Sequence, residues 1–190
     1  MDFNSVVKKR VSIKKFSSKK PAPEKVVELI ETANLAPTPG NIHIITYVMT
    51  DDKEKINEIA EACQQDFIKH APYVLVVCSN NKQLKKLYDK RAEKYLKHHV
   101  GAAMENLLLA AVNNNLGASV VGLFSEELIR NTLSIPENIE IEMIIPIGYE
   151  LLPGKSLPVA KKPALTNRLF FNGWGDKFYK GITKVRRVDY

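Results

Sequence analysis

The chain has 190 residues, of which 45% are hydrophobic and 26% are charged, and its formal net charge is +7. These values predict one soluble globular domain and exclude a disordered acidic chain, a low-complexity chain and a collagen-like chain. No apolar run approaches the roughly 18 residues that a membrane span needs, and Met1–Ser5 leads into charge, so we expect neither export nor a membrane anchor. Cys63 and Cys78 form no C-x-x-C motif, which argues against a disulfide framework or a metal site and favours a reducing cytoplasm.

Positive charge is concentrated at the two ends of the chain. Residues 1–20 carry a net charge of +6 and residues 177–190 carry +4, so the residues between them sum to −3. The basic ends therefore face an anion, which could be a nucleic acid or the phosphate of a small cofactor.

Helix and strand signals alternate along the chain, with no internal repeat. The apolar spacing and the capping residues predict five helices: Phe3–Arg10, Pro23 to the residue before Pro37, Asp51 (a cap with Glu54) to the Ala71–Pro72 pair, Val100–Ala111, and Ser125–Leu133. Apolar and β-branched runs predict four strands: Ile44–Val48, Tyr73–Cys78, Ala118–Leu123 and Ile139–Tyr149.

Three of these elements carry further information. The continuous apolar run Tyr73–Cys78 is typical of a buried central strand. The helix over Val100–Ala111 is apolar nearly all round, which predicts a place in the core or at a subunit contact. Pro146 cannot donate a hydrogen bond, so we expect its strand to be an edge strand or to carry a bulge.

The last forty residues, from Glu150 onwards, show proline and glycine punctuation and isolated aromatic residues but no clean period. A structureless stretch of that length is uncommon in a compact monomer. We expect it to wrap a second copy of the chain, where its aromatic side chains become buried. The alternative is a frayed tail.

The strongest candidate binding feature is Arg10, Ser12 and Lys14. In an extended segment alternate side chains point the same way, so two cations would flank a hydroxyl. Such a group can hold a phosphate through charge-assisted hydrogen bonds. The alternative is a solvated basic arm.

Two loops add weaker signals. The prolines and the glycine of Ala36–Asn41 predict a rigid loop that places Asn41 just before a strand. Gly122 follows a strand and would let a backbone amide approach a flat ligand closely. Each feature alone is more typical of an ordinary turn.

Taken together and in order, six motifs resemble the flavin-dependent nitroreductase family over residues 6 to about 165. They are R-x-S-x-K at Arg10–Lys14, A-P-T-P-G-N at Ala36–Asn41, the Ala71–Pro72 pair, G-A-A-x-x-N-L-L-L-A-A at Gly101–Ala111, L-G-A-S-V-V-G-L-F at Leu116–Phe124, and I-G-Y at Ile147–Tyr149.

This resemblance implies an α+β fold, a three-layer α/β/α sandwich with a central, mostly antiparallel sheet. It implies an FMN-binding domain over residues 1–165 and an extension over residues 166–190 that packs on the partner subunit. It also implies a homodimer with FMN at the interface and NADH or NADPH as electron donor. Hydride would pass to flavin N5 and then, in a ping-pong reaction, to a nitroaromatic, a quinone or a similar small acceptor.

The resemblance also implies site residues. Arg10 would bind the phosphate and Lys14 would lie near the pyrimidine edge, Asn41 would contact the isoalloxazine ring, and the backbone of Gly122 would donate near N5. Either Lys161 or Lys162 would close on the phosphate. The full set of expected FMN contacts is Arg10, Val11, Ser12, Lys14, Thr38, Pro39, Asn41, Gln64, Val121, Gly122, Lys161 and Lys162.

Three positions depart from the family pattern: Val11 replaces a basic or polar residue, His43 a glutamine, and His99 an acid. These departures bear on substrate preference. We expect no catalytic side chain, because solvent can supply protons to an open site, and we interpret all four histidines as surface or packing residues. Alternative functions are dehalogenation or flavin fragmentation by a family relative, or a basic nucleic-acid-binding module. The chain lacks the interleaved aromatic and basic residues of such a module, so we expect no nucleic-acid partner.

Overall fold

The computed structural model describes residues 1–152 and 163–177. The chain divides into two units, Met1–Ser156 and Leu157–Tyr190, and each is described by itself. Lys161 and Lys162 lie outside the described residues. The proposed domain boundary between residues 165 and 166 stays a prediction.

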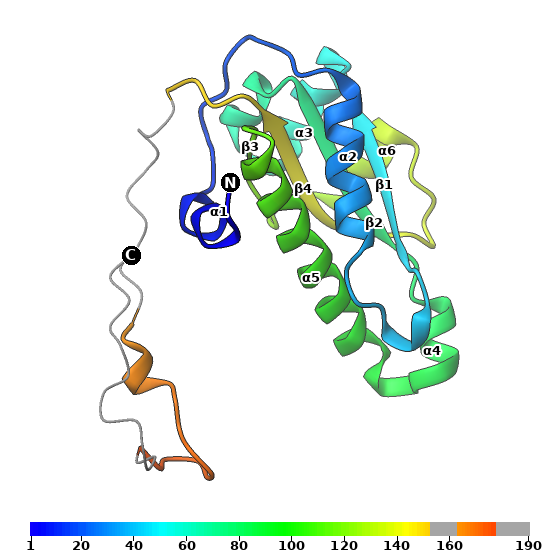
Figure 1. The fold of residues 1–190 in the computed structure, drawn as a ribbon. Coiled ribbons are helices and arrows are strands. Elements are labelled where there is room, and N and C mark those ends of the chain that lie inside the picture. Colours follow the sequence, from blue (N-terminus) through cyan, green and yellow to red (C-terminus); the bar gives the residue numbers. More distant parts are fainter. Residues whose placement is uncertain (153–162, 178–190) are drawn as a thin grey trace. The chain divides into compact units, whose positions relative to one another are not determined.

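The first unit contains the helices and the sheet (Figure 1). Its α-helices are α1 (Phe3–Lys9), α2 (Pro23–Asn34), α3 (Lys53–Cys63), α4 (Lys82–Tyr88), α5 (Ala92–Asn113) and α6 (Glu126–Leu133). Its strands are β1 (Ile45–Thr50), β2 (Tyr73–Ser79), β3 (Gly117–Ala118) and β4 (Glu140–Gly148). Three 3₁₀ turns connect these elements: η1 (Pro39–Asn41), η2 (Asp66–His70) and η3 (Asp89–Arg91).

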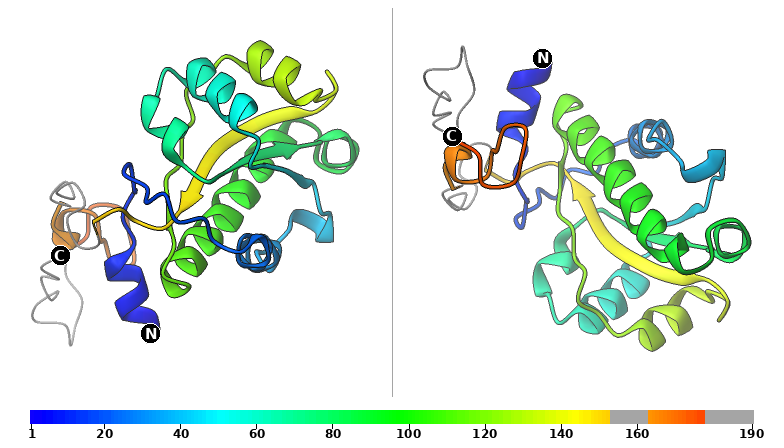
Figure 2. Two further views of the ribbon diagram at one scale, coloured as in Figure 1. Left: turned by 90° about the horizontal axis from the view of Figure 1, so that it is seen from above. Right: turned by 90° about the horizontal axis from the view of Figure 1, so that it is seen from below.

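The four strands form one sheet in the order β1-β2-β4-β3, and every neighbouring pair is antiparallel. Helices α2 and α5 cover one face, and α3 and α6 cover the other (Figure 2). Strand β2 is buried on both sides, because Leu75 and Val77 pack under α2 and α5 while Val74 and Val76 pack under α3 and α6. The predicted α/β/α sandwich with an antiparallel sheet is confirmed. Wrapping of a partner by the C-terminal extension stays a prediction.

The strand that contains Pro146 is not an edge strand, but it carries a register shift of the bulge type, so one of the two alternatives for it is confirmed. Strand β4 lies between β2 and β3, and its register shift falls near Glu142, opposite Val77 and Cys78. Pro146 is tolerated in an inner strand because its missing N–H faces the short strand β3. On that side its carbonyl accepts a hydrogen bond from the Ser119 N–H at 3.3 Å, where the ladder is already interrupted.

Other boundaries also differ from the sequence-based prediction. The N-cap of α3 is Asp52, whose side chain accepts from the amides of Glu54 and Lys55, and Asp51 instead pairs with Lys20. The strand predicted over residues 118–123 shrinks to β3 and an isolated bridge at Val121. Helix α5 begins eight residues before the predicted start, and α4 was not predicted.

The second unit is described over residues 163–177 and contains the 3₁₀ turn η4 (Leu165–Asn167). The rings of Phe170 and Trp174 lie 4.9 Å apart, and Lys177 Nζ lies 4.1 Å from the centre of the Phe170 ring. Trp174 is 94% exposed within this chain. In neither described part of the chain is a helix long and apolar enough to cross a membrane.

Candidate functional site

The segment that carries Arg10, Ser12 and Lys14 is extended and attached to the edge of the sheet. Ser12 forms a parallel bridge with Ala118, and the Ile13 N–H donates to the Ala118 carbonyl at 3.1 Å. Ile13 is buried, whereas Ser12 and Lys14 are exposed. Ser12 and Lys14 are therefore on the outer side of the segment, whereas Arg10 is half-buried at the end of α1.

Two glycines let this segment lie so close to the sheet. A Cβ placed on Gly117 would lie 2.6 Å from Ile13 Cγ1. A Cβ on Gly148 would lie 2.5 Å from Pro72 Cδ and 3.1 Å from Phe16 Cδ1. A larger residue at either position would therefore force Ile13 or Pro72 to shift. No local pattern in the sequence indicates this packing role, because a buried glycine beside a strand has no signature of its own.

The two cations of the segment are only weakly engaged by the chain itself. Arg10 is the C-cap of α1, and its Nε lies 3.8 Å from Glu105 Oε1 on α5. Lys14 Nζ lies 5.3 Å from the centre of the Phe67 ring. Partly exposed pairs of this kind contribute about 1 kcal/mol or less. Both cations can therefore engage an external anion.

Gly122 lies on an open surface beside this segment. Val121 exchanges two backbone hydrogen bonds with Ile144, both at 2.9 Å, and the chain then leaves the sheet. Apart from Gly122 and its two chain neighbours, no atom of the described residues lies within 4 Å of where a Cβ on Gly122 would be, and the nearby Val120 and Leu123 are 39% and 81% exposed. Packing within the chain does not require glycine here. An apolar, unobstructed surface is what a flat ligand needs.

Gln64 lies at the same end of the fold. It is the left-handed C-cap of α3, with φ of 52°, and its side chain is exposed. Phe67, the neighbour of Lys14, follows three residues later. The Ser125 N–H donates to the Ala62 carbonyl at 2.9 Å, which joins the end of α3 to the segment after Gly122.

The remaining expected contacts lie elsewhere. Thr38, Pro39 and Asn41 belong to the η1 loop, in which Gly40 and Asn41 have φ of 57° and 58°. This loop packs against α4, since Tyr88 Oη would lie 2.8 Å from a Cβ on Gly40.

The η1 loop and the N-terminal segment are well separated along α5 (Figure 1). The Tyr88 ring contacts Tyr95 near the start of α5, whereas Arg10 contacts Glu105, ten residues further on. At 1.5 Å per residue this separation is about 15 Å along the helix. Within one chain, Arg10–Lys14 form one segment that is bridged to Ala118 and contacts Phe67, three residues after Gln64, and Val121 and Gly122 follow Ala118 along the chain. Thr38, Pro39 and Asn41 lie apart from this segment along α5.

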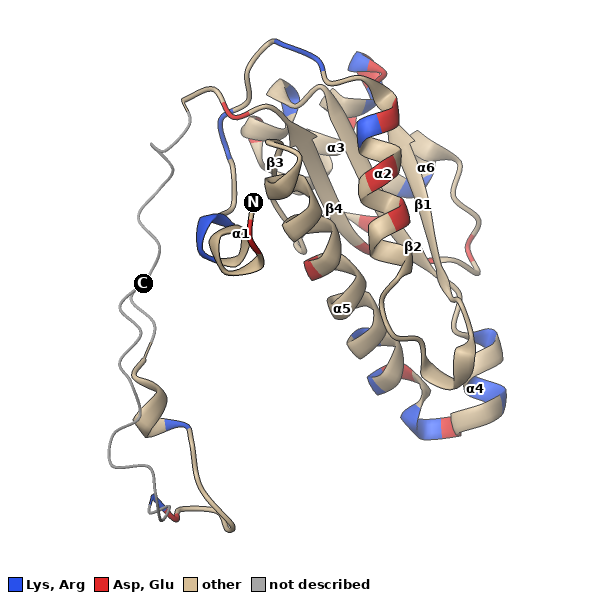
Figure 3. Cartoon of the chain, viewed as in Figure 1, with Lys and Arg blue, Asp and Glu red and all other residues tan. Residues whose placement is uncertain are grey.

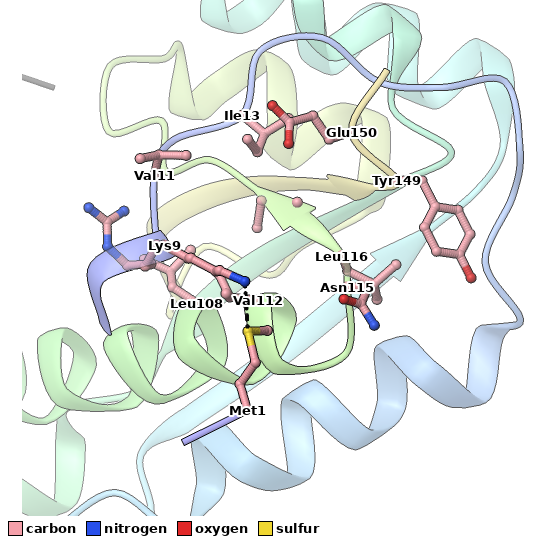
Figure 4. Close-up of a pocket in the computed structure, with 13 residues that line it drawn as sticks. Met1, Lys9, Val11, Ile13, Leu108, Val112, Asn115, Leu116, Tyr149 and Glu150 are labelled. Carbon is pink, nitrogen blue, oxygen red and sulfur yellow. Dashed lines mark hydrogen bonds between the residues drawn. The ribbon is translucent and has the colours of Figure 1, made fainter. Parts of the chain in front are cut away.

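A pocket of about 590 Å³ lies between α1, the end of α5 and β3 (Figure 4). It is lined by Arg10, Val11 and Ile13 but by neither Ser12 nor Lys14. The pocket thus lies on the inner side of the segment, away from the exposed hydroxyl and lysine.

His99 is the one buried histidine of the four. It is 5% exposed on α5, and within the described chain its Nδ1 has no hydrogen-bond partner. Burial, with His43 adding to it, lowers the pKa of His99, so it is neutral near pH 7. His43, His70 and His98 are exposed.

Comparison with known proteins assigns the chain to a family. The sequence model of the nitroreductase family matches residues 7–68 and 59–149. The chain belongs to the nitroreductase family. It is 30% identical, over 145 residues, to a protein of Archaeoglobus fulgidus assigned as an NADH dehydrogenase/NAD(P)H nitroreductase, which covers 74% of this chain and 80% of that protein. It is also 22% identical, over 179 residues, to an iodotyrosine deiodinase of Thermotoga neapolitana, covering 80% of this chain and 91% of that protein.

Solved structures share the fold. The NADPH:FMN oxidoreductase of Vibrio harveyi, in complex with NAD⁺, superposes with a TM-score of 0.78 at 21% identity, over 92% of this chain and 78% of that one. A nitroreductase family protein of Clostridium novyi NT superposes with a TM-score of 0.73 at 25% identity, over 94% and 97%. The predictions of the family, the fold and an oxidoreductase enzyme are confirmed.

Proposed function

We propose that the protein is an FMN-dependent NAD(P)H oxidoreductase of nitroreductase type that works as a homodimer. The A. fulgidus relative is assigned as an NAD(P)H nitroreductase, and a structural neighbour from Clostridium difficile is an FMN-dependent nitroreductase. Free, buried Cys63 and Cys78 are compatible with a reducing compartment, and we propose the cytoplasm.

One observation supports the proposal of a homodimer. The expected flavin contacts fall into two groups separated along α5, one around Arg10 and Gly122 and one in the η1 loop. In the proposed homodimer each flavin takes the first group from one subunit and the η1 loop from the other. Two-fold symmetry then makes two equivalent sites.

The residues of the first group fit FMN in charge and in shape. Arg10 and Lys14 supply cations and Ser12 a hydroxyl for the phosphate and the pyrimidine edge. Val120 and Leu123 present apolar surface beside Gly122, whose open position leaves room for the ring. When bound, FMN supplies two-electron hydride transfer between NAD(P)H and an acceptor.

The chain's own contribution is binding, orientation and electrostatics. In the proposed complex Lys14 would stabilise negative charge at the pyrimidine edge, and the backbone of Gly122 would donate a hydrogen bond. No acid or base from the protein is required, because protons reach an open site from solvent. The acceptor is a small molecule such as a nitroaromatic or a quinone.

The purified protein tests this proposal directly. We expect it to be yellow, to retain flavin through gel filtration, and to elute at the mass of a dimer. Anaerobic mixing with NADH or NADPH should bleach the flavin absorbance, and a nitroaromatic or a quinone should restore it. A colourless monomer that ignores added FMN would refute the proposal.

The same purified protein also tests two alternative functions, dehalogenation and nucleic-acid binding. The T. neapolitana relative is an iodotyrosine deiodinase, so a halotyrosine is tested as electron acceptor beside the nitroaromatic and the quinone. Reaction with it alone would favour dehalogenation over nitro reduction. A flavin-free protein that binds oligonucleotides with a steep dependence on salt would indicate a nucleic-acid-binding module.

A further inference from the structure

Positive charge gathers over α4, η3 and the start of α5 (Figure 3). Residues 82–97 hold seven cationic side chains against Asp89 and Glu93, a net charge of +5. We call these seven the basic patch: Lys82, Lys85, Lys86, Lys90, Arg91, Lys94 and Lys97. The interpretation that basic character sits at the two ends overlooked them, because acids elsewhere bring the sum for the middle of the chain to −3.

Folding does not account for the basic patch. Lys97 Nζ pairs with Glu142 Oε2 at 2.8 Å, but within the described residues the other six cations form no ion pair, and all six are exposed. Lys82 and Lys86 lie four residues apart on α4, where like charges destabilise a helix. An external anion would offset this repulsion.

The basic patch borders the loop that we expect to contact the flavin. Leu87 and Tyr88, on α4 between the lysines, contact the η1 loop: Leu87 Cδ2 would lie 2.9 Å, and Tyr88 Oη 2.8 Å, from a Cβ on Gly40. Asn41 is the next residue of that loop. An anion on the patch therefore lies next to the proposed flavin site.

We propose that the basic patch binds the phosphate groups of the nicotinamide dinucleotide donor. This inference rests on the proposed function and adds the residues that recognise the donor. The dinucleotide must place its nicotinamide on the flavin, so its pyrophosphate, and the 2′-phosphate of NADPH, lie within one dinucleotide length of the ring. Lysines act as mobile point charges, which suits a charged ligand that must arrive and leave in every turnover.

The test compares two double variants that remove the same net charge. Lys85→Gln with Lys86→Gln neutralises part of the basic patch. Lys25→Gln with Lys55→Gln neutralises two lysines in the first turns of α2 and α3, neither of which forms an ion pair in the described chain. Flavin content and circular dichroism establish that each variant is folded and loaded like the wild type.

The readout is NADP⁺ binding to the full-length protein, measured by isothermal titration calorimetry. At about 25 mM salt we expect the patch variant to bind NADP⁺ about fivefold more weakly than the wild type, with the control variant within twofold. At about 200 mM salt the difference should largely vanish, because screening weakens exposed charges. Equal affinities of the patch variant and the control would overturn the inference.

Results that refute the proposed function differ from results that refute the role of the basic patch. A wild-type protein without flavin, or with a flavin that neither nicotinamide reduces, refutes that function whatever the titration gives. A flavin-loaded protein whose reduction is normal but whose NADP⁺ affinity is unchanged in the patch variant refutes only the role of the basic patch.

Discussion

The substitution Gly122→Ala should have opposite effects on the stability of the fold and on the affinity for FMN. Apart from residue 122 and its two chain neighbours, no atom of the described residues lies within 4 Å of the new Cβ of Gly122→Ala, and the backbone there is not in the left-handed region. The folded chain therefore accommodates alanine without a clash. Alanine also restricts the unfolded chain, so the free energy of unfolding should rise by about 0.4–1 kcal/mol or stay unchanged.

Flavin binding should respond in the opposite direction. If the ring lies against Gly122, the methyl group overpacks the contact at a cost of about 1–3 kcal/mol, which weakens FMN binding about 5- to 150-fold. The assay is fluorescence titration of apoprotein with FMN, beside thermal unfolding of the same apoprotein. Wild-type FMN affinity in Gly122→Ala would refute the placement of the ring. A large loss of apoprotein stability would refute the reading of this surface as open.

Three further predictions follow from the same structure. Gly117→Ala, whose Cβ would meet Ile13 Cγ1 at 2.6 Å, should destabilise the fold by about 1–3 kcal/mol and lower Tm by about 2–12 °C in thermal unfolding; an unchanged Tm would contradict the close packing of the N-terminal segment. Because burial holds the pKa of His99 below its ordinary value of 6.5, the unfolded state takes up the proton first, and stability should fall as pH drops from about 7.5 to 5.5. In chemical denaturation His99→Leu should flatten this dependence and the exposed-site control His98→Leu should not; parallel profiles of the two variants would argue against a buried neutral His99. Burial raises the pKa of Cys63 and of Cys78 to about 11, so neither thiol should react with Ellman's reagent near pH 8 until the protein is denatured; rapid labelling of the native protein would contradict that burial.

The sequence predicted the layers of the fold because hydrophobic periodicity reports local burial. A continuous apolar run at Tyr73–Cys78 correctly indicated a strand covered on both faces. Pro146 indicated an irregular strand but not its place inside the sheet, because the strands that pair with β4 lie far from it in the sequence. The short strand β3 leaves the N–H side of Pro146 without a regular partner, and nothing near Pro146 in the sequence encodes that.

The sequence predicted part of the geometry around the candidate site residues, and their role in binding stays a prediction. Alternation placed Ser12 and Lys14 on one side of an extended segment, as the structure has them. Gly117, which lets that segment reach the sheet, has no local signature. The separation of Asn41 from Arg10 follows from the path of α5, which no short motif encodes. The basic patch was not predicted from the sequence, because the charge was summed over the whole middle of the chain, where acidic residues outweigh the local positive charge.

Flavin binding by a mixed dimer tests most directly whether each flavin is held by residues of two subunits. Arg10→Glu and Asn41→Asp each break one half of the proposed site, and aspartate tolerates the left-handed backbone at that position. Two differently tagged chains, each with one substitution, are co-expressed and the heterodimer is isolated. If each flavin takes Arg10 from one subunit and Asn41 from the other, one site of the heterodimer holds both substitutions and the other holds none. The heterodimer should then bind one FMN at wild-type affinity, while either variant homodimer binds FMN poorly. A heterodimer as weak as the two homodimers would mean that both residues serve the same subunit's flavin, and would contradict a site completed by a second copy of the chain.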